Sequence, residues 1–120
     1  MKTHSISKKN ILKSSKLLDK VFTYGKKISS SSCSLYYLKT KSGEGFRVAF
    51  SVGKKTHNLA VNRNKIKRFM REAFRLNREK YGVYSYDMVF VFFDKDIPPY
   101  EKVENSIKSL LLSLSKTFES

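Results

Sequence analysis

Residues 60–75, AVNRNKIKRFMREAFR, have the spacing of one long helix with two different faces. At 3.6 residues per turn, one stripe is apolar and comprises Ile66, Phe69 or Met70, and Ala73. A second stripe steps by three or four and is entirely basic, comprising Arg63, Lys67, Arg71, Arg75 and Arg78. The apolar stripe predicts a helix packed on a core, and the basic stripe predicts contact with phosphate.

Sequences typical of strands lie on both sides of this helix. Residues 35–40 and 46–52 are rich in aromatic and β-branched residues, and a turn at residues 41–45 joins them, so we expect a hairpin. Apolar residues alternate with small or polar ones along 46–52, which places a core on one face. Residues 88–93 form a continuous apolar run, which predicts a central strand covered on both sides.

Two more amphipathic helices complete the pattern. Residues 14–25 have a helical apolar spacing, with Ser14 or Ser15 as the cap and Gly25 as the stop. From Tyr100, apolar residues recur at steps of three and four as far as Phe118. The serine-rich residues 29–34 are interpreted as a short extra strand, so the expected order is αβββαβα.

Length and charge limit the possible functions. A chain of 120 residues fits one domain, 1–120, in which residues 1–10 read as a mobile basic arm. The formal net charge of +15 calls for a polyanionic partner, with nucleic acid first and an anionic membrane surface second. The apolar runs are too short to span a bilayer, and the first residues lack the apolar core of a secretory signal. We therefore expect a cytoplasmic protein.

The basic residues are concentrated in one region. From Lys54 to Lys80 there are ten Lys or Arg residues and only two acidic residues, whereas a merely solvated helix mixes the two signs. This clustering predicts nucleic-acid contact that weakens steeply with salt. Four rings near the predicted sheet, those of Phe22, Tyr36, Tyr37 and Phe46, belong either to the core or to a surface that stacks on unpaired bases.

Catalytic and metal-binding patterns are weak. The loop around Lys54 and Lys55 lacks the first glycine of a phosphate-binding Walker loop, because Val48 occupies that position. Asp94 and Asp96 could together hold Mg²⁺, but Asp residues before two prolines are typical of a turn. Cys33 is the only cysteine, which excludes an internal disulfide and indicates a small buried residue. No metal site and no protein nucleophile are predicted.

The central motif resembles that of a known family. Residues 63–68, RNKIKR, preceded by FSVGKK at 50–55 and followed by REAFR at 71–75, are similar to the signature of the bacterial ribonuclease P protein subunit. The similarity extends to DKVF at 19–22 with Gly25, to the strand at 87–91, and to Tyr100-Glu101. It covers most of residues 11–118.

The resemblance implies both a fold and a role. The fold is an α/β, or α+β two-layer, sandwich with a four-stranded sheet and a left-handed βαβ crossover, similar to ribosomal proteins; sequence physics alone favours the right-handed form. The role is that of the RNA-binding subunit of a ribonucleoprotein endonuclease that removes the 5′ leader from precursor tRNA. The resemblance further implies that the partner RNA holds the catalytic centre and most of the Mg²⁺, and that the chain alone is not catalytic. The partners are then that RNA and the leader, not DNA or a membrane.

The resemblance also implies which residues bind RNA. The matching positions for the catalytic RNA are Lys54, Lys55, Arg63, Asn64, Lys65, Lys67, Arg68, Arg71 and Arg75. Phe22 and Tyr36 match positions lining a leader cleft between the first helix and the sheet. Two positions depart from the family pattern. Lys65 replaces an arginine and loses its bidentate geometry, and Leu18 replaces an aromatic residue in the cleft.

Two other functions would suit the same charge. A structural ribosomal or other RNA-binding protein is the main alternative, and only the specific motif separates it from the ribonuclease P subunit. A DNA-binding regulator would place the basic helix in a major groove and would need a helix-turn-helix partner or a dimer surface, neither of which is evident.

Overall fold

The computed structural model describes residues 8–40, 45–81 and 85–119. Its elements are η1 (Lys8–Asn10), α1 (Ser15–Tyr24), β1 (Lys26–Ser29), β2 (Cys33–Lys39), β3 (Arg47–Val52), α2 (Ala60–Asn77), η2 (Glu79–Tyr81), β4 (Tyr86–Phe92) and α3 (Tyr100–Glu119). The helices and strands follow the predicted order αβββαβα. The predicted α+β fold with a four-stranded sheet is confirmed.

The sheet has the strand order β1-β2-β4-β3. Strand β2 pairs antiparallel with β1 and with β4, whereas β3 pairs parallel with β4. The predicted central strand is therefore β4, whose residues are buried except for the half-buried Val91. Its continuous apolar sequence reflects burial from both faces.

The predicted hairpin between residues 35–40 and 46–52 is wrong. Strands β2 and β3 run antiparallel, but β4 lies between them and pairs with both. Strand β4 is one of the two inner strands, so its backbone groups pair on both sides, and the helices cover both of its faces. Residues 41–44 of the predicted turn lie outside the described residues.

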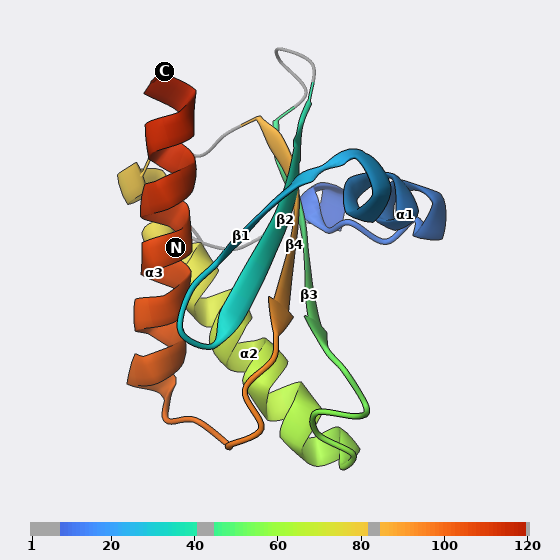
Figure 1. Cartoon of the computed structure of the whole chain (residues 1–120), viewed down its shortest axis with the longest axis vertical. Coiled ribbons are helices and arrows are strands. Elements are labelled where there is room, and N and C mark those ends of the chain that lie inside the picture. The colour runs from blue at the N-terminus through green and yellow to red at the C-terminus, as the bar shows by residue number, and fades with distance from the viewer. Residues whose placement is uncertain (1–7, 41–44, 82–84, 120) are drawn as a thin grey trace.

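Helices cover both faces of the sheet (Figure 1). Helices α2 and α3 lie together on one face, and α1 lies alone on the other. Helix α2 connects β3 to the parallel, adjacent β4, which forms the expected βαβ unit. The left-handed sense of this crossover stays a prediction of the family resemblance.

The main core lies between the sheet and the helices α2 and α3. The alternation predicted for residues 46–52 is confirmed, because Phe46, Val48, Phe50 and Val52 all pack in or against this core. From α2 the buried residues are Ile66, Met70, Ala73, Phe74 and Asn77. From α3 the core receives Val103, Ile107, Leu110, Leu111 and Leu114.

The opposite face of the sheet is covered less completely. A small cluster of Leu12, Val21 and Val89 is buried beneath α1. Around it, several apolar side chains are only partly buried: Leu17, Leu18, Tyr36, Leu38, Ala49 and Val91. Because one short helix covers this face, part of the sheet remains accessible beside it.

Two predictions near the N-terminus need correction. The extra strand lies at Lys26–Ser29, directly after α1, and the serines at 30–32 form the connection to β2. Residues 8–10 of the predicted mobile arm form η1, and the Asn10 side chain donates a hydrogen bond to the Phe46 carbonyl oxygen, 2.7 Å away. Residues 1–7 lie outside the described residues.

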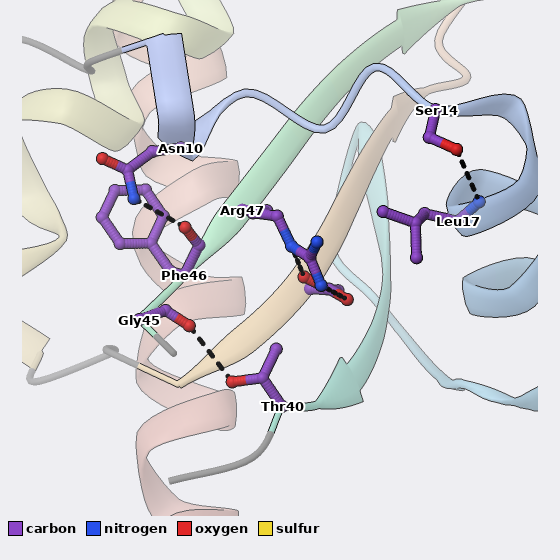
Figure 2. A network of polar contacts seen from close by, with 8 residues as sticks. Asn10, Ser14, Leu17, Thr40, Gly45, Phe46 and Arg47 are labelled. Carbon is purple, nitrogen blue, oxygen red and sulfur yellow. Dashed lines mark hydrogen bonds and ion pairs between the residues drawn. The ribbon is translucent and has the colours of Figure 1, made fainter. Parts of the chain in front are cut away.

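Polar contacts hold the start of β3 in place (Figure 2). The Arg47 guanidinium binds the Asp87 carboxylate on the neighbouring strand with two hydrogen bonds of 2.7 and 2.9 Å. The Thr40 hydroxyl donates to the Gly45 carbonyl oxygen, 3.1 Å away. Gly45 has a φ of 79°, which a residue with a side chain rarely adopts.

Candidate nucleic-acid interface

The basic residues of α2 extend around the side of the helix opposite its buried stripe, from the flank next to β3 to the flank next to α3. Lys67 and Arg71 lie on the flank next to β3, where they line a hollow of about 210 Å³. Arg68 lies on the other flank, next to α3, and lines a second hollow. The predicted basic stripe is thus only part of the cationic surface of this helix.

The hollow beside β3 connects the two faces of the sheet. Besides Lys67 and Arg71, its lining residues are Ile11, Leu12, Val48, Ala49 and Phe50. Leu12 belongs to the cluster beneath α1 and Ala49 packs against that cluster, whereas Val48 belongs to the main core and Phe50 packs against it. A polynucleotide bound along this edge could therefore extend from the sheet face covered by α1 to the basic flank of α2.

Residues 8–12 form part of the same edge. The Leu12 amide donates to the Val48 carbonyl oxygen, 2.9 Å away, and Ile11 pairs with Val48 in a parallel bridge. This segment covers the start of the β3 edge, and its residues Ile11 and Leu12 line the hollow. The sequence showed no strand-type pattern here, so this contribution was missed.

Arg63 fixes the loop that precedes α2. Its Nη1 donates hydrogen bonds of 2.9 Å to the carbonyl oxygens of both His57 and Asn58. The N-cap residue Leu59 offers no side-chain hydrogen bond to the first turn, and Arg63, which is a donor, instead ties the carbonyl oxygens of the preceding loop to the helix. Arg63 therefore has a structural task in addition to its predicted contact with RNA.

Lys54 and Lys55 lie in the turn that this loop contains. The amides of Thr56 and His57 both donate to the Gly53 carbonyl oxygen, at 3.1 and 3.0 Å, and both lysines are exposed. His57 is buried, and its Nε2 lies 2.9 Å from the Asp94 carbonyl oxygen. The loop thus presents two cations from an anchored backbone.

Further along α2, two arginines interact with groups of the protein itself. Arg75 pairs with Glu72 one turn earlier on the same helix. The guanidinium of Arg78 lies 4.3 Å from the centre of the Phe46 ring, a cation–π contact. Asn64, Lys65 and Arg68 are exposed. The end of the predicted stripe therefore serves the fold as well as the surface.

The predicted aromatic residues divide between core and surface. Tyr37 and Phe46 are buried, whereas Phe22 is 44% exposed and Tyr36 is half-buried. The Phe22 and Tyr36 rings form a T-shaped pair with centroids 4.8 Å apart, and the Lys27 ammonium lies 5.5 Å from the Tyr36 ring centre. These three side chains form an aromatic and cationic surface at the edge of α1.

Gly25 allows α1 to approach β2 closely. A Cβ atom at this position would lie 2.4 Å from the Val21 carbonyl oxygen and 2.6 Å from that of Tyr37. Both are backbone atoms that cannot move without shifting the helix or the strand. The glycine predicted as a helix stop therefore also positions Phe22 against Tyr36.

Asp94 and Cys33 have the structural roles that the sequence indicated, Asp94 in a turn and Cys33 as a small structural residue. The Asp96 amide donates to Asp94 Oδ1 at 3.1 Å, the pattern of an Asx turn, and Lys102 Nζ lies 2.9 Å from Asp94 Oδ2. The hydrogen bond from Lys102 is the main cause that lowers the pKa of Asp94. Burial raises the pKa of Cys33 to about 11, so its thiol is unreactive.

Other groups of the site were not apparent from the sequence. Lys27 lies opposite Tyr36 in the β1–β2 register. Because the extra strand was expected at residues 29–34, the sequence did not predict this neighbour. The pairing of Arg47 with Asp87 joins residues 40 positions apart. Within 8–40, 45–81 and 85–119, no cluster of three or more His, Cys, Asp or Glu side chains has a metal-binding arrangement. Over the same ranges, no helix is long and apolar enough to span a membrane.

Comparisons with known proteins agree with this architecture. The family described as Ribonuclease P matches residues 6–115. The ribonuclease P protein component of Clostridioides difficile is 36% identical over 94 residues, covering 77% of this chain and 80% of the relative. That of Pelotomaculum thermopropionicum is 36% identical over 103 residues, covering 85% and 89%.

Solved structures show the same fold. The RNase P protein of Staphylococcus aureus superposes with a TM-score of 0.75 at 27% identity, covering 91% of this chain and 97% of that protein. The RNase P protein of Thermotoga maritima gives a TM-score of 0.68 at 26% identity, covering 82% and 90%. Since the family match spans nearly the whole chain and both curated relatives exceed 30% identity, this chain belongs to the ribonuclease P protein family.

Proposed function

We propose that this chain binds the catalytic RNA of ribonuclease P and the single-stranded 5′ leader of precursor tRNA, and so assists removal of the leader. Its membership of the family makes it a component of a ribonucleoprotein nuclease of tRNA processing. The leader contact, the RNA contacts of individual residues and the site of catalysis are the proposed parts.

The hollow at the β3 edge is the observation that carries this proposal. It lies between the partly open sheet face beside α1 and the basic flank of α2. Beyond the hollow, the sheet face covered by α1 carries the rings of Phe22 and of Tyr36 on β2, two strands from β3, and these rings suit unpaired bases. The hollow itself offers Lys67 and Arg71, which suit phosphate. One polynucleotide surface can therefore hold the leader and the catalytic RNA close together.

The protein acts in this proposal by binding and charge neutralisation. Lys54, Lys55, Arg63, Asn64, Lys65, Lys67, Arg68, Arg71 and Arg75 contribute to the RNA-binding surface. Arginine offers a planar fork of donors to phosphate, and lysine offers a mobile point charge. Proton transfer and the Mg²⁺ ions of the reaction are assigned to the RNA partner, and the complex is placed in the cytoplasm.

Reconstitution tests the proposal. The purified chain is mixed at low Mg²⁺ with a bacterial ribonuclease P RNA and with precursor tRNA carrying or lacking a 5′ leader. We expect the chain to stimulate cleavage by the RNA, to bind the leader-bearing substrate preferentially in the complex, and to cleave nothing alone. Binding without stimulation of cleavage would favour the alternative of a structural RNA-binding protein.

Two variants separate specific from general charge effects. Arg71→Ala removes an exposed cation that lines the β3-edge hollow, and Lys116→Ala removes an exposed cation near the end of α3. We expect only Arg71→Ala to lower the salt slope of RNA binding, by about one counterion. Equal effects of the two variants would show that total charge, rather than this edge, determines binding.

A further inference from the structure

A second hollow lies between α2 and α3, on the flank of α2 that faces away from β3. It has a volume of about 340 Å³ and is lined by Arg68, Phe69, Glu72, Leu76 and Tyr100. This volume is near the lower limit of roughly 300 Å³ for small-ligand sites. Its walls are mainly aromatic and aliphatic, although it opens on the most basic helix of the protein.

The rings of this hollow are held rigidly. Phe69 and Tyr100 form a T-shaped pair with centroids 5.6 Å apart, and both pack against the main core. The Tyr100 hydroxyl lies 3.4 Å from Glu104 Oε2, to which it donates. Burial, followed by the charge of Glu104, raises the pKa of Tyr100 to about 12, so the phenol stays neutral. The site is therefore preformed and uncharged at its aromatic wall.

Cations surround the Phe69 ring. Lys65 Nζ lies 5.7 Å and Arg68 Cζ lies 6.0 Å from the ring centre. Both side chains are exposed, so they can also contact a bound polyanion. Glu72 is the opposing charge in the lining, and it pairs with Arg75. The apolar side chains and the Glu72 carboxylate disfavour phosphate inside the hollow, whereas the exposed Lys65 and Arg68 favour phosphate beside it.

We propose that this hollow binds one unpaired nucleobase of the partner RNA, with the flanking phosphates on Lys65 and Arg68. The base stacks on Phe69 and contacts Leu76 and Tyr100, and the Glu72 carboxylate can accept a hydrogen bond from an exocyclic amino group. The proposal rests on the RNA-binding function above and extends the RNA-binding surface around α2 to the side opposite the β3 edge.

A charge placed in the hollow tests the proposal. Leu76 is 45% exposed and lines the hollow, whereas Leu112 is 43% exposed and lies three turns further along α3 than Tyr100. Leu76→Glu and Leu112→Glu therefore change the net charge equally at equally accessible positions. Binding of each variant to fluorescently labelled ribonuclease P RNA is measured by anisotropy at constant salt.

We expect Leu76→Glu to weaken binding on the order of tenfold, and Leu112→Glu to weaken it by less than about twofold. Phe69→Leu keeps an apolar side chain but removes the stacking ring, and we expect a loss similar to that of Leu76→Glu. Thermal unfolding of each free variant separates a folding defect from a binding defect, and the Leu76→Glu result stands even if Phe69→Leu is unstable.

The outcomes also separate this inference from the proposed function. If the wild-type chain binds the RNA but Leu76→Glu and Leu112→Glu behave alike, the hollow does not bind a base and the general function remains. If the wild-type chain does not bind the RNA, both proposals are wrong. If Leu76→Glu abolishes self-association in sedimentation velocity while RNA affinity is unchanged, the hollow binds a second copy of the chain, which also overturns the inference.

Discussion

The Phe22 ring on α1 meets the Tyr36 ring on β2 at an interplanar angle of 68°, with centroids 4.8 Å apart. This contact joins the helix to the sheet, and the Tyr36 side of it is half-buried. Phe22 remains 44% exposed in it, so a base could stack without displacing either ring. Lys27 adds a cation close to the pair.

Replacement of Phe22 tests its role in leader binding. We expect Phe22→Ala to weaken binding of leader-bearing precursor tRNA to the reconstituted complex by about 1–3 kcal/mol, the usual loss for one base–aromatic stack. Binding of mature tRNA, which has no leader, should not change. Dissociation constants from filter binding provide the measurement. Tyr24→Ala is the matched control, because Tyr24 lies on the same helix and is 74% exposed; a loss equal to that of Phe22→Ala would contradict the assignment.

Replacement of Arg63 tests its role in holding the loop. Arg63→Ala removes two hydrogen bonds from a charged donor to the carbonyl oxygens of His57 and Asn58. We expect the free energy of unfolding to fall by about 1–2 kcal/mol, since hydrogen bonds to charged groups contribute somewhat more than neutral ones. Urea unfolding in the absence of RNA measures this change independently of any RNA contact. Asn64→Ala, at the exposed neighbouring position, should leave stability almost unchanged.

Substitution of Gly25 tests the close approach of α1 to β2. We expect Gly25→Ala to destabilise the fold by about 1–3 kcal/mol, because the added methyl group would overlap with two backbone oxygens. Gly53→Ala is the control, since a Cβ there meets only the Thr56 hydroxyl at 3.7 Å, an ordinary contact. Thermal unfolding of both variants gives the comparison, and equal midpoints would show that the helix adjusts without cost.

Low pH should weaken the contact between Asp94 and Lys102. The hydrogen bond from Lys102 lowers the pKa of Asp94 below its ordinary value of 3.8. A carboxyl group with a lowered pKa contributes stability above its unfolded-state value and loses it as the pH falls through the folded-state value. We therefore expect wild type to be more stable than Asp94→Asn at neutral pH, this difference to start shrinking near pH 3.8, and it to disappear once the pH is below the folded-state pKa of Asp94. Urea midpoints measured from neutral pH downward test this, and a difference that persists in acid would exclude the ionised pair as its cause.

The sequence predicted the elements of this fold better than their pairing. The apolar spacing around Ile66 and Met70 identified α2, and the continuous run from Met88 identified β4, because helix and strand periodicities are local properties. The pairing of β2 with β3 was predicted wrongly, since a short connection resembles a hairpin turn. Insertion of β4 between them depends on contacts between segments about 50 residues apart, which no local pattern encodes.

The candidate site shows the same division. The sequence by itself determined that a strongly basic helix with one apolar face exists, and its motif identified the family, because charge, spacing and motif are written in consecutive residues. Only the tertiary structure decided which cations share a surface. Packing on the core rotates α2 so that Lys67 and Arg71 line the β3 edge and Arg68 lines the hollow beside α3. It also brings Arg78 onto the Phe46 ring and Arg63 onto the loop before α2. Which surface each cation joins depends on which face of α2 is buried in the core and on which elements pack beside the helix. Contacts between distant parts of the chain determine both the buried face and the neighbouring elements.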